Sequence, residues 1–404
     1  MIRPISLFML VMVTVATKGY MTGDSPNFIG LVICLLLLPL LSVVAAKCMR
    51  CTKITPLFAT FAILFSWGAS IFVFSWAFLV REYVGEYFIL TEFCVLLPAF
   101  FWLGVLWFVA SPIQNRIAWV SHRFRLDILL LFIPVALLVT ISNSISLFGF
   151  EKFDSGIQLV SFFILLSCAP FFVTRILSTK PMKNYQLQCS IIEVGYRSGL
   201  RKIRIFVWNT HNRIMNALAI GILFQPKTIV LTDKLIATLS TKELLSVTAH
   251  EFGHHKYWHI PCMILTAVTA MLWLDRVYRF MHIELGGAFA MVTQLAGVVL
   301  AIVLVSRQFE EQADAYAAVD NSREFGDGCI TNEGAMIMAS ALGTLAQTQN
   351  IDMYKNDPLH GSIASRQQRL HALIGCSFLE LPINKRVFYI KVFLGVSFLV
   401  GIIL

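Results

Sequence analysis

Long uncharged stretches dominate the first 175 residues of the chain, and short charged stretches separate them. The uncharged stretches are Pro26–Ala46, Ile54–Val80, Phe93–Asn115, Ile128–Phe150 and Gly156–Thr174, with a shorter one at Pro4–Thr17. A helix that crosses a membrane needs about 20 mostly apolar residues. The pattern therefore predicts an N-terminal membrane domain, residues 1–175, with about six transmembrane helices.

The remaining residues alternate between polar and apolar stretches. The apolar ones are Ile260–Leu274, Leu285–Ser306 and Val387–Leu404. We expect a domain over residues 176–386, interrupted by a membrane hairpin at about 260–306, and then a C-terminal membrane segment, 387–404. The sequence leaves open whether the hairpin crosses the bilayer fully or re-enters on the same side.

Composition excludes an ordinary soluble enzyme. The 404 residues are 57% hydrophobic and only 14% charged, against about 25% charged in soluble domains. The net charge of +9 comes largely from basic loops that alternate with less basic ones, and the positive-inside rule makes the basic loops cytoplasmic. These loops contain Lys47, Arg50 and Lys53, then Arg116, Arg123 and Arg125, and then Arg175, Lys180 and Lys183. We therefore expect the lipid bilayer, and no nucleic acid, as a partner, with residues 176–259 at the cytoplasmic face.

The polar region after residue 176 predicts a small α+β unit. Alternating or β-branched residues indicate strands at Lys202–Trp208, Ala217–Phe224 and Thr228–Thr232, and Tyr185–Ser198 fits an amphipathic helix. Ser240-Thr-Lys-Glu243 is a capping box, so a helix is expected to begin there and to run to His255. The predicted fold class is mainly α: a polytopic α-helical membrane protein with a small α+β domain.

That last helix carries His250-Glu251-Phe-Gly-His254, an HExxH motif. Two histidines four residues apart share one helix face and can bind a single zinc ion as neutral imidazoles. Glu251 would face the open side of the metal as a general base, taking a proton from the attacking water. The motif predicts one zinc ion and hydrolytic chemistry.

A zinc site of this kind needs a third protein ligand. The best candidate is Glu310, which follows the apolar stretch that ends at Ser306. Asp314 lies four residues later on the same helix face and could orient a histidine ligand. Glu311 points about 100° away from Glu310 and is the weaker candidate.

Together these motifs resemble the membrane-integral zinc metallopeptidases that include the HtpX heat-shock protease and the CaaX prenyl protease. Asn216-Ala-Leu-Ala-Ile-Gly221 is similar to the family's NA-x-x-x-G strand, and His360-x5-Arg366 to its HP-x4-R element, with Gly361 in place of the proline. The resemblance implies an HExxH (gluzincin-type) metalloprotease domain with zinc on His250, His254 and Glu310. It also implies a substrate strand beside Asn216, with His360 and Arg366 near the site. His360 is expected to polarise the scissile carbonyl, and Arg366 to contact either the substrate or a carboxylate such as Asp314.

We expect a zinc metalloendopeptidase that cuts membrane-associated or misfolded protein substrates at the cytoplasmic face. Three alternatives stay open: a CaaX-type protease acting on a lipidated C-terminus, a membrane signalling metalloprotease, and a metal-binding protein without turnover. His259 is expected at a helix end or the membrane interface, and His255 at the membrane interface; Cys48-x-x-Cys51 is not expected to bind metal.

Overall fold

A computed structural model of the chain describes residues 27–48, 55–85, 88–111, 116–129, 133–134, 137, 140–141, 154–221, 226–281, 287–323 and 328–403. The predicted segment Pro4–Thr17 and most of Ile128–Phe150 lie outside these residues. The chain divides into two compact units, Met1–Leu165 and Leu166–Leu404, and each is described by itself.

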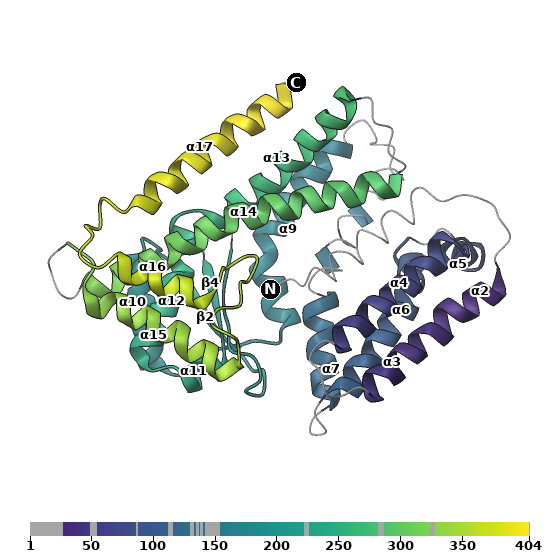
Figure 1. The fold of residues 1–404 in the computed structure, drawn as a ribbon, viewed down its shortest axis with the longest axis horizontal. Helices are drawn as coiled ribbons and strands as arrows, with labels where there is room; N and C mark the ends of the chain where they lie inside the picture. Colours follow the sequence, from purple (N-terminus) through teal and green to yellow (C-terminus); the bar gives the residue numbers. More distant parts are fainter. Residues whose placement is uncertain are drawn as a thin grey trace. The chain divides into compact units, whose positions relative to one another are not determined.

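Unit 1 is helical throughout its described residues (Figure 1). Its elements are α2 (Phe28–Val32), η1 (Ile33–Leu37), α3 (Leu38–Cys48), α4 (Thr55–Phe72), α5 (Trp76–Val84), α6 (Phe88–Ala110), α7 (Arg116–Phe124) and η2 (Arg125–Leu129). Helix α9 (Asp154–Ile176) crosses the boundary into unit 2. Trp67 of α4 is buried, and its indole N–H donates to the carbonyl of Val95 in α6 at 2.9 Å. Such bonds tie α4 to α6 where the apolar packing alone would allow sliding.

Within the described residues, four helices are long and apolar enough to cross a membrane: Phe28–Cys48, Phe93–Ala110, His259–Phe280 and Pro382–Ile403. The predicted single span Ile54–Val80 is different, because α4 and α5 meet at a bend of 64°. Ser75 at this break has φ of 58°, a left-handed conformation that interrupts the helix. The hydropathy of these residues predicts an apolar span, but it carries no information about a bend in the backbone.

Unit 2 contains a four-stranded sheet with helices packed against it. The strands are β1 (Lys180–Pro181), β2 (Ile203–Trp208), β3 (Ala217–Ile220) and β4 (Lys227–Thr232), in the order β1-β2-β4-β3. β2 and β4 are parallel, and the other two pairs are antiparallel. β3 is thus an edge strand of the sheet. It ends at Ile220, earlier than predicted, and the predicted end at Phe224 lies outside the described residues.

The helices of unit 2 are α10 (Tyr185–Arg197), α11 (Asp233–Thr238), α12 (Thr241–Lys256), α13 (His259–Phe280), α14 (Gly287–Ser322), α15 (Asn332–Gln349), α16 (Ile363–Ala372) and α17 (Pro382–Ile403). Their buried core includes Phe252 of α12, Leu370 of α16 and Val387 of α17. Gly253 lies where α12 packs closely against α14: a Cβ there would lie 3.3 Å from Cδ1 of Tyr316 and 3.4 Å from the Cα of Ala313, so a larger residue would require a small shift of the Tyr316 ring. This close approach positions the two helices that carry the predicted ligands.

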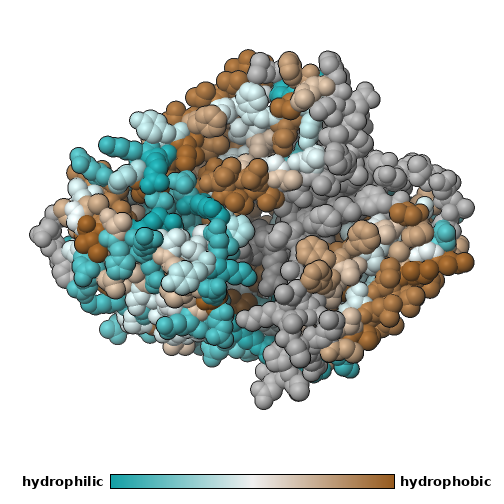
Figure 2. Space-filling view, in the orientation of Figure 1, coloured by the Kyte–Doolittle hydropathy of each residue, from teal (hydrophilic) through white to brown (hydrophobic). Residues whose placement is uncertain are grey.

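Polarity separates two ends of unit 2. Hydrophilic residues gather around α15 and α16, whereas hydrophobic residues cover much of α13 and α17 (Figure 2). The long helix α14 runs from the apolar end into the polar end, so that its first part follows the predicted hairpin and its second part carries Glu310. The zinc motif therefore lies where apolar helices enter the polar part of the unit.

Candidate metal centre and active site

Helix α12 begins at the predicted capping box. Ser240 Oγ accepts a hydrogen bond from the backbone N–H of Glu243, and the Glu243 carboxylate accepts one from the backbone N–H of Ser240. The helix then runs without interruption to Lys256, which places His250 and His254 one turn apart on one face. Buried core residues before and within the motif, Ala249 and Phe252, fix the rotation of this face toward α14.

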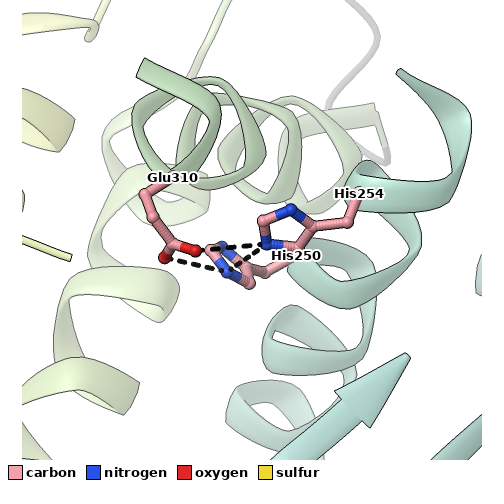
Figure 3. A group of neighbouring side chains, drawn as sticks. All are labelled: His250, His254 and Glu310. Atoms are coloured by element: carbon pink, nitrogen blue, oxygen red, sulfur yellow. Dashed lines mark hydrogen bonds and ion pairs between the residues drawn. The ribbon is translucent and has the colours of Figure 1, made fainter. Parts of the chain in front are cut away.

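Three donor side chains converge between α12 and α14 (Figure 3). The Nε2 atoms of His250 and His254 are 3.2 Å apart, and the two Glu310 carboxylate oxygens lie 3.6 and 3.5 Å from them. Metal–ligand distances of about 2.0–2.2 Å in a tetrahedral site require donor atoms roughly 3.3–3.5 Å apart. The His–His–Glu set therefore fits one zinc ion by donor type and by spacing, and all three ligand atoms lie within 4.8 Å of one another.

A buried ion pair supports this group from behind. Asp314 lies 2.9 Å from Nδ1 of His250, and the Arg366 guanidinium donates to both Asp314 oxygens at 2.8 and 2.6 Å. Burial raises the pKa of Asp314, but Arg366 outweighs it and holds that pKa well below its usual range. The carboxylate stays charged and lies beside Nδ1 of His250 as an ion-pair contact rather than an aligned hydrogen bond. A negative charge at this position favours a proton on Nδ1, which leaves Nε2 with a lone pair for a metal.

The Glu310 carboxylate is charged for similar reasons. Burial raises its pKa, while His250, His254 and Arg366 together lower it below the ordinary value. Arg366 Nη2 lies 3.6 Å from a Glu310 oxygen. Arg366 thus contacts both carboxylates of the cluster, and the contact with Asp314 is the carboxylate tie that the sequence left open as one of two roles.

Glu251 lies beside the sheet edge. Its Oε2 accepts a hydrogen bond from the backbone N–H of Ala219 in β3 at 3.0 Å. That N–H points away from β4, so it belongs to the free edge of the sheet. Asn216, the residue before β3, is exposed. Its backbone N–H donates to Oγ1 of Thr232 at 3.0 Å, and its carbonyl accepts from the same hydroxyl at 3.1 Å. The structure therefore places Glu251, the predicted base, at the edge strand β3, beside which a substrate strand is predicted to lie.

His360 approaches the group from the loop before α16. Its Nε2 is 3.8 Å from Glu310, and its Nδ1 is 2.9 Å from Asp357 Oδ1. Gly361 has φ of 77°, which proline cannot adopt because its ring fixes φ near about −65°. Gly361, which stands where the family pattern has proline, therefore allows a tight turn. In this turn Asp357 and Gly361 exchange backbone hydrogen bonds.

A cavity of about 430 Å³ lies next to His360. Its lining is mostly polar and includes Arg307, Arg369 and Tyr354, with Glu311 as the acidic member. Glu311 already pairs with Arg386 at 3.0 Å and lies 3.9 Å from Arg369. Two guanidinium groups therefore face a cavity that adjoins the candidate metal centre.

Three side chains behind His254 were not predicted from the sequence. His259, Gln312 and Asn384 follow one another in a hydrogen-bonded series that starts at His254 Nδ1. His259 does begin a helix, as expected, but its ring is 1% exposed and stacks on Phe309. The histidine-dense run after the HExxH motif was the available signal; Gln312 and Asn384 gave none.

His255 also differs from expectation. It is buried rather than interfacial, and burial, with a smaller contribution from Lys227, lowers its pKa to about 3. It is not one of the three donor side chains, and its Nε2 has no hydrogen-bond partner among the described residues. It therefore packs as a neutral core side chain.

Two histidines one turn apart, a carboxylate from a second helix and a glutamate beside a sheet edge define the zinc metallopeptidase class of site. Comparison with known proteins agrees: residues 181–326 match the sequence model of peptidase family M48. The resemblance to the membrane-integral zinc metallopeptidases, and with it zinc as the cofactor, is thereby confirmed.

Two curated relatives are similar over part of the chain. The CAAX prenyl protease 1 of Saccharomyces cerevisiae is 37% identical over 87 residues, covering 21% of this chain and 19% of that protein. The CAAX prenyl protease 1 homolog of Dictyostelium discoideum is 31% identical over 176 residues, covering 37% of this chain and 40% of that protein. The alignments thus span less than half the length of either relative.

Among solved structures, that of S. mikatae Ste24p matches with a TM-score of 0.54 and 19% identity, over 86% of this chain and 100% of that one. At this identity the likeness concerns the fold. It confirms the predicted fold class, a polytopic helical membrane protein with a small α+β metallopeptidase domain, and the chain is an integral membrane protein.

Proposed function

We propose that the chain is a membrane zinc endopeptidase that hydrolyses peptide bonds of membrane-associated or misfolded proteins at the cytoplasmic face. The observation that carries the proposal is the joint placement of His250, His254 and Glu310 within metal-binding distance, next to Glu251 on the free edge of β3. Metal binding alone would explain why His250, His254 and Glu310 lie together. A peptidase site would also explain why Glu251 lies at a free sheet edge.

Glu251 and His360 have separate roles in the proposed reaction. Zinc, when bound, acts as a Lewis acid and lowers the pKa of water. Glu251 accepts the proton of the attacking water and later gives it to the leaving amine. His360 donates from Nε2 to the oxyanion; because its Nδ1 faces Asp357, the ring has to carry a second proton to do so.

The substrate is held as an added strand beside β3. In the free enzyme the Ala219 N–H is occupied by Glu251. An entering peptide carbonyl would take over this N–H, and Glu251 would be released toward the water that it activates. Main-chain hydrogen bonds of this kind bind many sequences, which suits an enzyme for misfolded proteins.

The direct test is the Glu251→Gln variant of the full chain in detergent or liposomes. We expect it to retain one zinc per chain and to lose cleavage of an unfolded casein-like substrate by at least about 100-fold, since general base catalysis contributes 10²–10⁴-fold. Glu333→Gln, at an exposed position in the first turn of α15, is the matched control and should cleave like the parent. Full activity of Glu251→Gln would refute the assignment.

The cytoplasmic orientation rests on the charge of the loops and has its own experiment. Cys189 on α10 is exposed, and a variant that keeps this cysteine alone can be treated with a membrane-impermeant maleimide. We expect labelling only after the cells are permeabilised. Labelling of intact cells would place the domain on the other side.

A second candidate function is proteolytic processing of a lipidated C-terminus. The relatives' name points to it, and so does the cavity beside His360, where Arg307 and Arg369 are suited to a peptide's terminal carboxylate. Prenylated and unprenylated peptides, each as free acid and as amide, separate the readings. Faster cleavage of the prenylated free acid, reduced by Arg307→Gln or Arg369→Gln but not by exposed Arg204→Gln, would favour processing; equal rates would favour the general endopeptidase.

A further inference from the structure

Three side chains connect the candidate ligand His254 to the C-terminal helix α17. His254 Nδ1 lies 2.9 Å from His259 Nδ1, His259 Nε2 lies 2.9 Å from Gln312 Oε1, and Gln312 Nε2 donates to Asn384 Oδ1 at 2.7 Å. His259 and Gln312 are 1% and 3% exposed, so neither contact competes with bulk water. We call these three residues the relay.

The relay determines which nitrogen of His254 carries a proton. Asn384 Oδ1 accepts from the Gln312 amide, which leaves Gln312 Oε1 to accept the Nε2 proton of His259. Neutral His259 then has only a lone pair on Nδ1, so His254 has to donate its proton from Nδ1. Nε2 of His254, which faces Glu310, is left with a free lone pair.

The opposite arrangement would prevent metal binding. If Gln312 turned its NH₂ group toward His259, every donor and acceptor in the series would reverse, and His254 would carry its proton on Nε2. That Nε2 could not coordinate an ion. In the structure Asn384 presents its oxygen to Gln312, and in this orientation it opposes the reversal, because that oxygen can accept a hydrogen bond but not donate one.

Packing holds Asn384 in place. Its neighbours Ile383 and Val387 are buried in the core of unit 2, and Lys391, further along α17, donates from Nζ to the carbonyl of Tyr257. The His259 ring is stacked at 4.4 Å on Phe309, with an interplanar angle of 2°. The relay is thus fixed at both ends by elements that are themselves packed.

We propose that Asn384 of the apolar C-terminal helix, acting through Gln312 and His259, is a positioning residue that sets the tautomer of His254 for zinc binding. The inference rests on the proposed ligand role of His254. It makes α17 a functional part of the metal centre as well as a membrane segment. Partners of this kind behind a histidine ligand are typically worth 10–100-fold in metal affinity.

The test measures zinc affinity of the purified full chain by competition with a chromogenic chelator, together with the visible absorption of the cobalt-substituted protein. Asn384→Leu removes the acceptor at similar volume, and Gln312→Met breaks the relay from α14. Asn384→Asp keeps an oxygen that can only accept and is the rescuing variant. Lys385→Ala, exposed on the same turn of α17, is the matched control.

We expect Asn384→Leu and Gln312→Met to weaken zinc binding at least about tenfold and to alter the cobalt bands, whereas Asn384→Asp and Lys385→Ala stay within about threefold of the parent. Parental affinity and bands in both breaking variants would overturn the proposal, as would a loss in Asn384→Asp equal to that in Asn384→Leu. If one breaking variant does not fold, the other decides. A parent that binds zinc but cleaves no peptide would contradict the proposed peptidase function and leave this test intact.

Discussion

The Arg366→Met variant removes the positive partner of a buried carboxylate and keeps the length of the side chain. Arg366 is 8% exposed and Asp314 is 3% exposed, and two hydrogen bonds of 2.6 and 2.8 Å join them. Without Arg366, the buried carboxylates of Asp314 and Glu310 would both lose their guanidinium partner. The variant should therefore destabilise unit 2 whether or not a substrate is involved.

The expected size follows from the burial of both partners. Breaking a buried ion pair by removing one partner costs about 3–5 kcal/mol. At about 2–4 °C per kcal/mol for a unit of this size, the unfolding midpoint should fall by roughly 6–20 °C. Arg369, three residues later on α16, is the matched control: its side chain is 37% exposed and lies 3.9 Å from Glu311, so Arg369→Met should cost less than about 1 kcal/mol.

The assay is thermal unfolding of the zinc-free full chain in detergent, which excludes any contribution from metal binding. Adding Asp314→Asn to Arg366→Met removes the stranded charge and should recover at least half of the loss, because a pair deleted as a whole is often nearly neutral. Equal midpoints for Arg366→Met and Arg369→Met would refute the reasoning. A double variant no more stable than the single one would show that the charge was not the cause.

Further expectations concern the zinc helix, the metal and pH. Ser240→Ala should lower the stability of unit 2 by about 1 kcal/mol in the same assay, because it removes the capping box; no change would mean that packing alone holds α12. Zinc addition should raise the unfolding midpoint of the parent but not of His254→Ala, since donors from α12 and α14 bind one ion; an equal rise in both would exclude this site. Burial raises the pKa of Asp233, but its hydrogen bonds from Thr210, Asn212 and Lys234 hold that pKa below its ordinary value. The stability that the charged Asp233 carboxylate contributes is present above about pH 4 and is lost as pH falls through its pKa in the folded state. The destabilisation caused by Asp233→Asn, measured by urea titration, should therefore shrink toward pH 3; a constant difference across this range would contradict the expectation.

Much of unit 2 was predictable because its signals are local. The capping box at Ser240 determines where α12 begins, and alternation and β-branching located β2 and β4 to within a residue. The i, i+4 spacing of His250 and His254 placed both imidazoles on one face before any packing was known. Glu310 and Asp314 followed from the same helical arithmetic on α14.

Other features required contacts between distant segments. The parallel pairing of β2 with β4 leaves β3 at the edge, and nothing in either strand's composition states this order. The bend between α4 and α5 depends on one left-handed serine, which hydropathy does not register. The predicted division into domains at 175 and 386 stays a prediction.

The sequence by itself determined which groups are available to this protein: a zinc-binding helix, a further carboxylate ligand and enough apolar residues for membrane-spanning helices. Helical periodicity and residue type are sufficient for that, since they act within a few residues. Only the tertiary structure decided which ring nitrogens of the histidines are available to bind a metal. Arg366 is 52 residues from Asp314, and Asn384 is 72 residues from Gln312, yet these pairs lie within hydrogen-bond distance. Their contacts determine which ring nitrogen of His250 and of His254 carries the proton. A tautomer is set by the partner of the other ring nitrogen and not by the neighbouring residues in the chain.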